Sequence, residues 1–454
     1  MAALVKNSIC IFFLLLAGKL AAQIPVIGAD SLAKHYQEKM NRFIDRDTLL
    51  GDFYSIDLNG IAVFAGKKEK LANQPEYRVT WQELPLYKKI MLAVPRNEAM
   101  QIMKAKGGGP FSPQIQREYG AEKSVVENHF MPLNEKPLNG YRIVLDPGHF
   151  AFDSLSARLE DKFIDLYLPE GNDSTRVLFY ESQLTWQTAI LLQQKLQAAG
   201  AEVLLTRHAN FWTAFGKTFE EWKIQDYPRT LDSLLKINPA DPNLKMLKSG
   251  RLKDNKSIFR YVFRDVELRK RAELINAFHP DLSVIIHFNV DEQNRPWKKT
   301  GDKNFCMAFV GGAFLPGELS DPEMRFDFLR LLLTDELEQS IYVSGLATAA
   351  FTSELEVPLA KTKDATYLQT YCLPAGPPGV FCRNLSLTRM VRGPLIFGET
   401  LYQDNKDECE RLGKEANDPA WRKAHPEESD VALFRVNEVA EAYYQAILNW
   451  AKSR

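Results

Sequence analysis

The sequence lacks the features of several large protein classes. It has only 5 cysteines in 454 residues and no Cys-x-x-Cys pair, which argues against a zinc site built from cysteine thiolates. Its formal net charge is −1, so it has no dominant positive field for holding nucleic acid, and we expect no nucleic-acid partner. Internal repeats and low-complexity tracts are absent too. What remains is an ordinary globular composition, 45% hydrophobic and 25% charged.

Long apolar runs are absent beyond the N-terminus. The stretch ICIFFLLLAG at residues 9–18 follows Lys6, and small residues lead to a cleavage position after Ala22. A basic start, an apolar core of about ten residues and small residues before the cut are typical of a secretory signal. Such a run is too short to span a bilayer comfortably. We therefore expect residues 1–22 to be a signal peptide. The remaining chain is expected to be exported, periplasmic or extracellular, with no stable membrane insertion.

Signal cleavage leaves four cysteines, which are Cys306, Cys372, Cys382 and Cys409. An oxidising compartment permits disulfides, and Cys372 and Cys382 flank a turn-rich segment that can bring them together. Buried free thiols are the alternative, and the sequence does not choose between the two states.

Residues 23–140 predict a small α+β region whose role the sequence does not reveal. Residues 30–44 have helical spacing, and residues 53–65 alternate about a central Asn-Gly pair, as in a β-hairpin. Residues 76–84 predict another strand. The segment 133–140 resembles a linker to the rest of the chain.

From residue 141 to 454, short apolar runs alternate with helical patterns. The runs predict strands at residues 142–146, 202–206, 282–287, 306–310 and 394–398. The helical patterns lie at residues 182–199, 266–278, 325–350 and 436–450. This alternation predicts an α/β fold, with a twisted, mainly parallel sheet flanked by helices on both faces, next to the small N-terminal α+β region.

Two long irregular stretches, at about 150–180 and 210–260, interrupt this scheme. The second is expected to contain short helices around FEEWKI and TLDSLLKI. Long insertions in a compact domain are usually functional, so each is a candidate lid over a substrate groove. Trp212 and Trp222 in the second insertion either stack on sugars or pack within the loop, and we favour packing.

Four polar side chains stand at one edge of the predicted sheet. His149 follows the first strand through a Pro-Gly turn, and His287 closes the third strand. Glu399 closes the last strand, and Glu181 begins the first helix. Sites in open parallel sheets form outside the carboxyl ends of the strands, where the helix N-termini also lie. Two imidazoles and one carboxylate suit a zinc ion with an open fourth position, and a second carboxylate suits a general base.

Each of the four residues also has an ordinary structural explanation. His149 fits a turn histidine, and His287 fits a hydrogen-bonded core histidine. Glu181 favours the positive end of a helix dipole, and Glu399 fits a solvated acid at a strand exit. The spacing alone does not decide between the two interpretations.

Four motifs together resemble the zinc-dependent N-acetylmuramoyl-L-alanine amidases of the amidase 3 type, which remodel bacterial cell walls. They are VLDPGH, YESQLTWQTAILLQQKLQAAGAEVLLTR, RAELINAFHPDLSVIIHFN and GPLIFGET, and the resemblance covers about residues 141–454. It implies that His149, Glu181 and His287 bind zinc and that Glu399 is the catalytic acid/base. It also implies a peptidoglycan or muropeptide substrate, in which the amide joining the lactyl group of N-acetylmuramic acid to L-alanine is hydrolysed.

The chain departs from the family pattern in three places. HFAFD follows the first histidine where the family usually has a second glycine run. The loop to Glu181 is longer than usual and contains Glu170, a competing ligand that we disfavour because no helix follows it. The insertion at 210–260 leaves the substrate breadth open. Asp146 is interpreted as a turn former rather than a partner of an imidazole.

Two other functions remain open from the sequence. One is a zinc peptidase that cleaves within peptidoglycan stem peptides. The other is a non-catalytic cell-wall-binding protein. The sequence argues against it, because all four candidate site positions carry a residue that can bind the metal or transfer a proton. Protein regulators and the oligomeric state cannot be read from the sequence.

Overall fold

The computed structural model describes residues 28–107, 109–120, 136–151, 153–170, 173–294, 299–417 and 433–454. The predicted signal peptide at residues 1–22 lies outside this part of the chain. Within the described ranges, none of the helices has the length and apolar character needed to cross a membrane.

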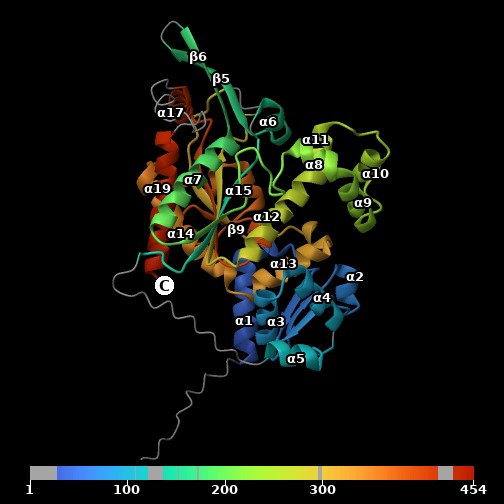
Figure 1. Cartoon of the computed structure of the whole chain (residues 1–454). Coiled ribbons are helices and arrows are strands. Elements are labelled where there is room, and N and C mark those ends of the chain that lie inside the picture. Colours follow the sequence, from blue (N-terminus) through green and yellow to red (C-terminus); the bar gives the residue numbers. More distant parts are fainter. Residues whose placement is uncertain are drawn as a thin grey trace, which may run out of the picture.

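A seven-stranded sheet forms the centre of the molecule (Figure 1). Its strands, in the order β10-β11-β9-β12-β8-β4-β7, are β4 (Arg142–Pro147), β7 (Glu202–Leu205), β8 (Leu282–Asn289), β9 (Met307–Val310), β10 (Leu373–Pro374), β11 (Val380–Cys382) and β12 (Leu395–Tyr402). Strands β7, β4, β8 and β12 run parallel, whereas β9 is antiparallel to β12. The predicted mainly parallel sheet is therefore confirmed, and each predicted run forms a strand.

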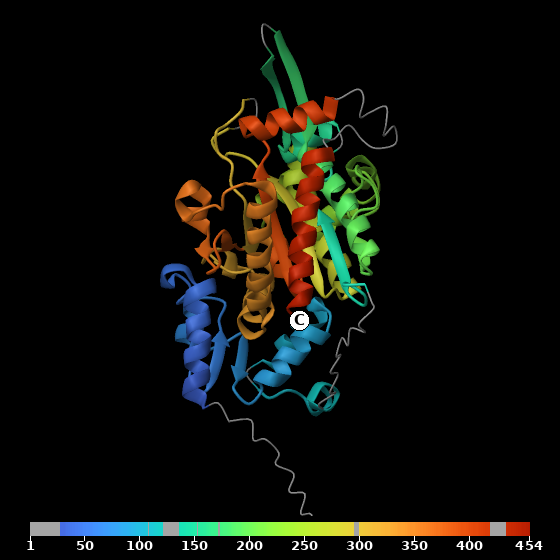
Figure 2. The same ribbon diagram turned by 90° about the vertical axis from the view of Figure 1, so that its left-hand side faces the viewer.

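Helices cover both faces of the sheet (Figures 1 and 2). On one face lie α7 (Glu181–Ala198), α14 (Glu336–Leu355) and α19 (Leu433–Lys452), and on the other lie α12 (Arg264–Phe278), α15 (Thr366–Tyr371) and α16 (Ser386–Met390). Strand β4 shows why both faces are apolar. Ile143 and Leu145 belong to the hydrophobic core on the side of α7, α14 and α19. Val144 belongs to the core on the side of α12, α15 and α16, because successive side chains of a strand point to opposite faces.

The single helix predicted at residues 325–350 is wrong, because two helices occupy this segment. They are α13 (Pro322–Leu333) and α14, which begins at Glu336. Thr334 has extended backbone angles, φ −90° and ψ 165°, and its hydroxyl donates to the carbonyl of Arg330 at 2.9 Å. Its backbone N–H donates to the same carbonyl at 2.9 Å, so the helical bonding of α13 is complete up to Thr334 and ends there because the backbone turns extended. The apolar periodicity continues across the break and hides it in the sequence.

The N-terminal region packs beneath the sheet, at the end of the molecule opposite the hairpin of β5 (Phe163–Glu170) and β6 (Asp173–Tyr180) (Figure 1). Its elements are α1 (Ala29–Lys39), the π-turn η1 (Met40–Ile44), the 3₁₀ turn η2 (Arg46–Thr48), β1 (Tyr54–Asp57), β2 (Gly60–Val63), α2 (Lys67–Leu71), β3 (Tyr77–Thr80), α3 (Leu84–Ala93), α4 (Arg96–Lys106) and α5 (Pro113–Gly120). The predicted helix, hairpin and third strand are present. Tyr77 and Phe43 share a core with Phe326 and Phe328 of α13, and Arg96 pairs at 2.8 Å with the fully buried Asp327. The boundary at residue 140 stays a prediction.

The segment 150–180, predicted to be irregular, is largely folded. It contains α6 (Ser154–Glu160) and a hairpin of β5 (Phe163–Glu170) and β6 (Asp173–Tyr180) that projects from the body (Figure 1). Asp153 caps α6 by accepting from the amides of Leu155 and Ser156. The hairpin also packs against α17 (Lys406–Asn417). The prediction was wrong because this hairpin lies outside the main sheet and follows no βα rhythm.

The insertion at 210–260 forms a small helical unit with its own core. Its helices are α8 (Phe219–Gln225), α9 (Tyr227–Ile237), α10 (Pro242–Lys248), α11 (Asn255–Ile258) and the π-turn η3 (Phe259–Phe263), which leads into α12. The two predicted short helices are present as α8 and α9. Trp222 is 1% exposed and packs against Phe263, so for this residue packing is the correct interpretation.

The cysteines left open by the sequence are all free and buried. They are Cys306, Cys372, Cys382 and Cys409. Burial raises the pKa of the Cys306 thiol to about 11 and that of the Cys372 thiol to about 12. A thiol of this kind holds little thiolate at neutral pH, so these side chains act as small apolar groups.

Candidate metal centre

The turn after β4 brings His149 to the end of β8. His149 has a φ of 61°, in the left-handed region that residues other than glycine rarely adopt. The preceding Gly148 is needed for a different reason. A Cβ on Gly148 would lie 2.3 Å from Cε1 of His287, so only glycine lets the second imidazole approach. The backbone strain of this turn therefore lies at His149, and the glycine is required for space.

Buried donors hold the three carbonyl groups of this turn, residues 147–149. Arg271 donates to the carbonyl oxygens of Pro147 and His149 at 2.7 and 3.1 Å. Arg207 also donates to the carbonyl oxygen of Pro147, at 3.2 Å. The hydroxyl of Thr185 donates to the carbonyl oxygen of Gly148 at 2.6 Å. Asp146, interpreted from the sequence as a turn former, lies instead within β4, is 1% exposed and pairs with Arg271 at 3.1 Å. These bonds offset the backbone strain at the histidine.

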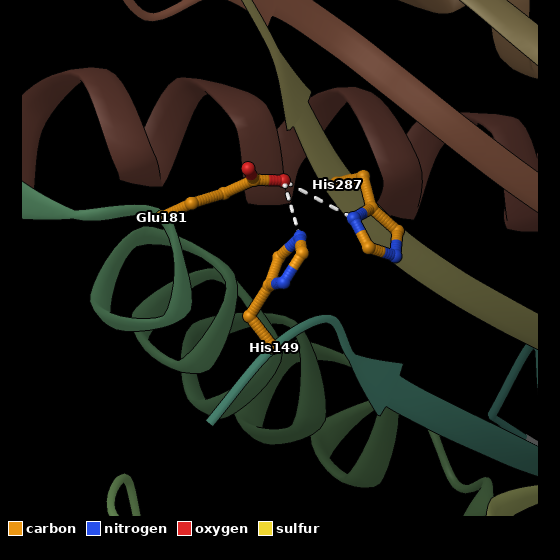
Figure 3. A group of neighbouring side chains, drawn as sticks. All are labelled: His149, Glu181 and His287. Carbon is orange, nitrogen blue, oxygen red and sulfur yellow. Dashed lines mark hydrogen bonds and ion pairs between the residues drawn. The ribbon is translucent and has the colours of Figure 1, made fainter. Parts of the chain in front are cut away.

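Glu181 is the first residue of α7, and its carboxylate lies between two imidazoles (Figure 3). Its Oε1 is 3.2 Å from Nε2 of His149 and 3.1 Å from Nδ1 of His287, and the Glu181 side chain is fully buried. One ligand-type atom from each residue lies within 4.8 Å of the other two. Three residues that are far apart in the sequence therefore meet at one point.

This group of atoms fits a metal ion. Nε2 of His149 is buried and has no hydrogen bond of acceptable geometry, although the Glu181 carboxylate is close by. A buried polar atom without a partner is unfavourable unless another group uses it. Two imidazoles and one carboxylate are ligands that suit zinc.

The protonation states of the group follow from its close charges. Burial lowers the pKa of His149, but the carboxylates of Glu181 and Glu160 outweigh burial and raise it to about 9. Burial lowers the pKa of His287, and the neighbouring His149 adds to this effect. Although burial opposes it, His149 and Lys162 hold the pKa of Glu181 well below its usual range. In the metal-free protein, one imidazolium and one carboxylate therefore face each other.

Glu160, which the sequence did not single out, orients the first histidine. Its Oε1 lies 3.1 Å from Nδ1 of His149, and its Oε2 accepts from the amides of Phe150 and Ala151 at 3.1 and 3.0 Å. Such a carboxylate fixes the tautomer and the direction of a metal-binding imidazole. Glu160 is the last residue of α6, so only the fold of the 150–180 segment brings it here.

Glu399 lies on β12, directly opposite His287 of β8 in the parallel register. Within the described ranges it does not belong to the group of converging ligand atoms. Burial raises the pKa of Glu399 to about 7, and the negative charge of Glu181 adds to this effect. A carboxyl group that titrates near neutral pH suits an acid/base role.

The competing acid Glu170 lies elsewhere in the hairpin. It is the last residue of β5, at the tip, whereas Glu181 follows Tyr180 at the base, where Phe163 pairs with Tyr180. Glu170 therefore lies at the opposite end of the hairpin from Glu181, and the choice of Glu181 as a ligand stays a prediction.

A cavity of about 540 Å³ adjoins the histidines. Its lining includes His149 and His287, together with Phe259 and Arg260 of the 210–260 insertion. Its volume is typical of sites that bind small molecules or short polymer segments. The insertion therefore forms one wall of the candidate site.

Comparison with known proteins gives one family and a set of similar structures. The family model described as N-acetylmuramoyl-L-alanine amidase matches residues 143–426. Apo Ami1 from Mycobacterium abscessus is 14% identical, covers 69% of this chain and 99% of its own, and has a TM-score of 0.34. The CwlD amidase from Clostridioides difficile, solved in complex with the GerS lipoprotein, is 15% identical and has a TM-score of 0.36. The match covers 69% of this chain and 100% of the CwlD chain. No curated protein sequence matches the chain.

Proposed function

The chain belongs to the N-acetylmuramoyl-L-alanine amidase family, and we propose that it hydrolyses the amide between N-acetylmuramic acid and L-alanine in peptidoglycan. Membership makes it an amidase with peptidoglycan as its substrate class. The matched segment, residues 143–426, contains His149, Glu181, His287 and Glu399. The finer proposal concerns the bond that is cleaved, the metal and the role of each of these residues.

In this proposal, a zinc ion is held by His149, Glu181 and His287. The observation that carries it is a buried carboxylate oxygen within 3.2 Å of a nitrogen from each of two imidazoles. When bound, zinc supplies Lewis acidity to the scissile carbonyl and to the attacking water. Glu160 and the donors to the turn carbonyls keep the His149 imidazole in its binding orientation.

Glu399 moves the proton in the proposed reaction. Its carboxylate accepts a proton from the water whose oxygen adds to the carbonyl carbon, and it then delivers that proton to the leaving amine nitrogen as the C–N bond breaks. The pKa of about 7 supports both steps, because the group is an effective base and an effective acid near neutral pH. The products are a free lactyl carboxylate and a stem peptide with a new L-alanine N-terminus.

Product analysis on purified muropeptides tests the proposal. The zinc-loaded protein should release intact stem peptides with free L-alanine N-termini, and a chelator should stop the release until zinc is restored. Cleavage between stem residues would instead support a zinc peptidase. Binding to the wall with no new amino groups would support a non-catalytic wall-binding protein.

Zinc binding is expected to release about one proton at pH 8. At this pH Glu399 is mostly ionised, whereas His149, with its pKa of about 9, still carries a proton that a ligand must lose. Zinc affinity should therefore rise with pH up to about 9 and then level off. Calorimetric titrations in two buffers of different ionisation enthalpy measure the release. Glu160→Gln should reduce it, because one of the carboxylates that raise this pKa is removed. A heat of binding that does not depend on the buffer would contradict the prediction.

A further inference from the structure

Three basic side chains form a stripe along the wall of the cavity. Lys256 lies in α11, Arg260 in η3 and Arg264 at the start of α12, and all three are exposed and line the cavity. A spacing of four residues places them on one face of this nearly continuous helix. We call these three residues the basic rim.

The basic rim is only partly neutralised. Lys256 pairs with Asp161 at 2.8 Å, and Arg264 contacts Asp265 at 3.0 Å, in pairs whose side chains are more than half exposed. In the described part of the chain, Arg260 has no carboxylate within ion-pair distance, and its guanidinium lies 5.7 Å from the ring of Tyr261. Arg260 is therefore a cation at the edge of a cavity with capacity to bind an anion.

The carboxylates inside the cavity are already engaged. Glu267 pairs with Arg271 at 2.8 Å, and Glu160 accepts from two backbone amides and contacts His149. The acids deep in the cavity therefore do not neutralise the basic rim, and an anion that enters meets positive charge first.

The inner surface of the same wall is apolar. Phe259 and Phe263 line the cavity together with Phe150, and Phe397 stacks on the ring of His287 at 4.7 Å.

Two cations close to the histidines, Lys162 and Arg271, also line the cavity, but they already pair with Glu181 and Glu267. The cavity thus presents apolar groups and engaged cations near the histidines, and the exposed basic rim at its wall. A ligand that fits is small and apolar near the reacting bond and acidic beyond it.

We propose that the basic rim, with Arg260 as its main contact, binds a free carboxylate on the stem residue that follows L-alanine. This inference rests on the proposed function and names the substrate form that the enzyme prefers. The methyl group of L-alanine suits the apolar surface, and a guanidinium offers two parallel donors to a carboxylate. The 210–260 insertion and the start of α12 supply the rim, and this insertion is one of the places where the sequence departs from the family pattern.

Binding to two matched ligands tests the inference. The ligands are N-acetylmuramoyl tripeptides whose second residue carries either a free α-carboxyl group or an α-carboxamide. Zinc-loaded Glu399→Gln protein serves as the background, so that binding is measured by calorimetry without turnover. We expect the acid to bind about fivefold more tightly than the amide at low salt, with the preference shrinking as ionic strength rises.

Variants of the rim separate the inference from general charge effects. Arg260→Gln should reduce the preference to about twofold or less, and the Arg260→Gln/Arg264→Gln pair should remove it. Arg251→Gln, an exposed arginine of the same insertion that does not line the cavity, should leave it unchanged. Equal binding of acid and amide, or a preference that survives the double change, would overturn the inference. If the protein with native Glu399 cleaves both ligands equally well at the lactyl–alanine bond, the proposed function stands and only the inference fails.

Discussion

Glu399→Gln is expected to lower kcat for muropeptide hydrolysis by about 10³-fold while the zinc content stays at the level of the unchanged protein. Glutamine has the shape of glutamate but cannot accept the proton of the attacking water. Glu399 lies opposite His287 in the sheet and outside the group of converging ligand atoms, so its replacement should not disturb the metal. Single-turnover kinetics, together with metal analysis of the same preparation, measure both quantities.

The control for this change is Glu354→Gln, which alters an exposed carboxylate near the end of α14. It should leave both rate and zinc content unchanged. If Glu399→Gln turns over at the normal rate, Glu399 is not the acid/base. If it loses zinc together with activity, Glu399 helps to hold the metal, and the assignment of the three ligands is incomplete.

His287→Ala is expected to weaken zinc binding by far more than the 10- to 100-fold loss typical of removing an outer-shell partner, and to abolish hydrolysis. The change removes one of the two imidazoles that face the Glu181 carboxylate. Because zinc binds the folded state only, it should also stabilise the unchanged protein by about 2.7 kcal/mol at a concentration 100 times its Kd. The rise in Tm on adding zinc should therefore disappear in the variant.

His208→Ala provides the matched control, because His208 is an exposed histidine outside the group of converging ligand atoms. Its zinc content and its zinc-dependent rise in Tm should equal those of the unchanged protein. A His287→Ala protein that keeps one zinc ion per chain after gel filtration would refute the proposed ligand set.

The sheet and the meeting of the site residues were predictable because both depend on simple rules. Apolar runs such as residues 282–287 form buried strands, and the carboxyl ends of parallel strands lie at one edge. His149 follows β4 and His287 lies near the end of β8, so the pairing of these two strands brings them together. Their chemical roles stay predictions, which the two experiments above test.

Other parts of the site were not predictable, since they depend on packing between distant elements. Glu160 reaches His149 only because a capped helix and a projecting hairpin fill a segment that looked irregular. Arg271 sits in an ordinary helical pattern, and nothing in that pattern shows that it donates to the turn carbonyls. The single predicted helix at 325–350 failed for a related reason: the extended backbone at Thr334, where α13 ends, leaves no mark on the apolar period.

Phe150 gives the site a mechanical property that bears on substrate choice. It follows His149 directly, is 3% exposed, and packs against Phe219 and Phe263 of the insertion core, with ring centroids 6.3 and 5.4 Å away. An outward swing of the insertion would pull this ring out of its aromatic neighbours and drag the adjoining imidazole with it. The position of the insertion and the position of His149 are therefore coupled through this ring. We expect that trimming the insertion to admit bulkier muropeptides would also displace the histidine, whereas replacing single side chains that line the cavity would not.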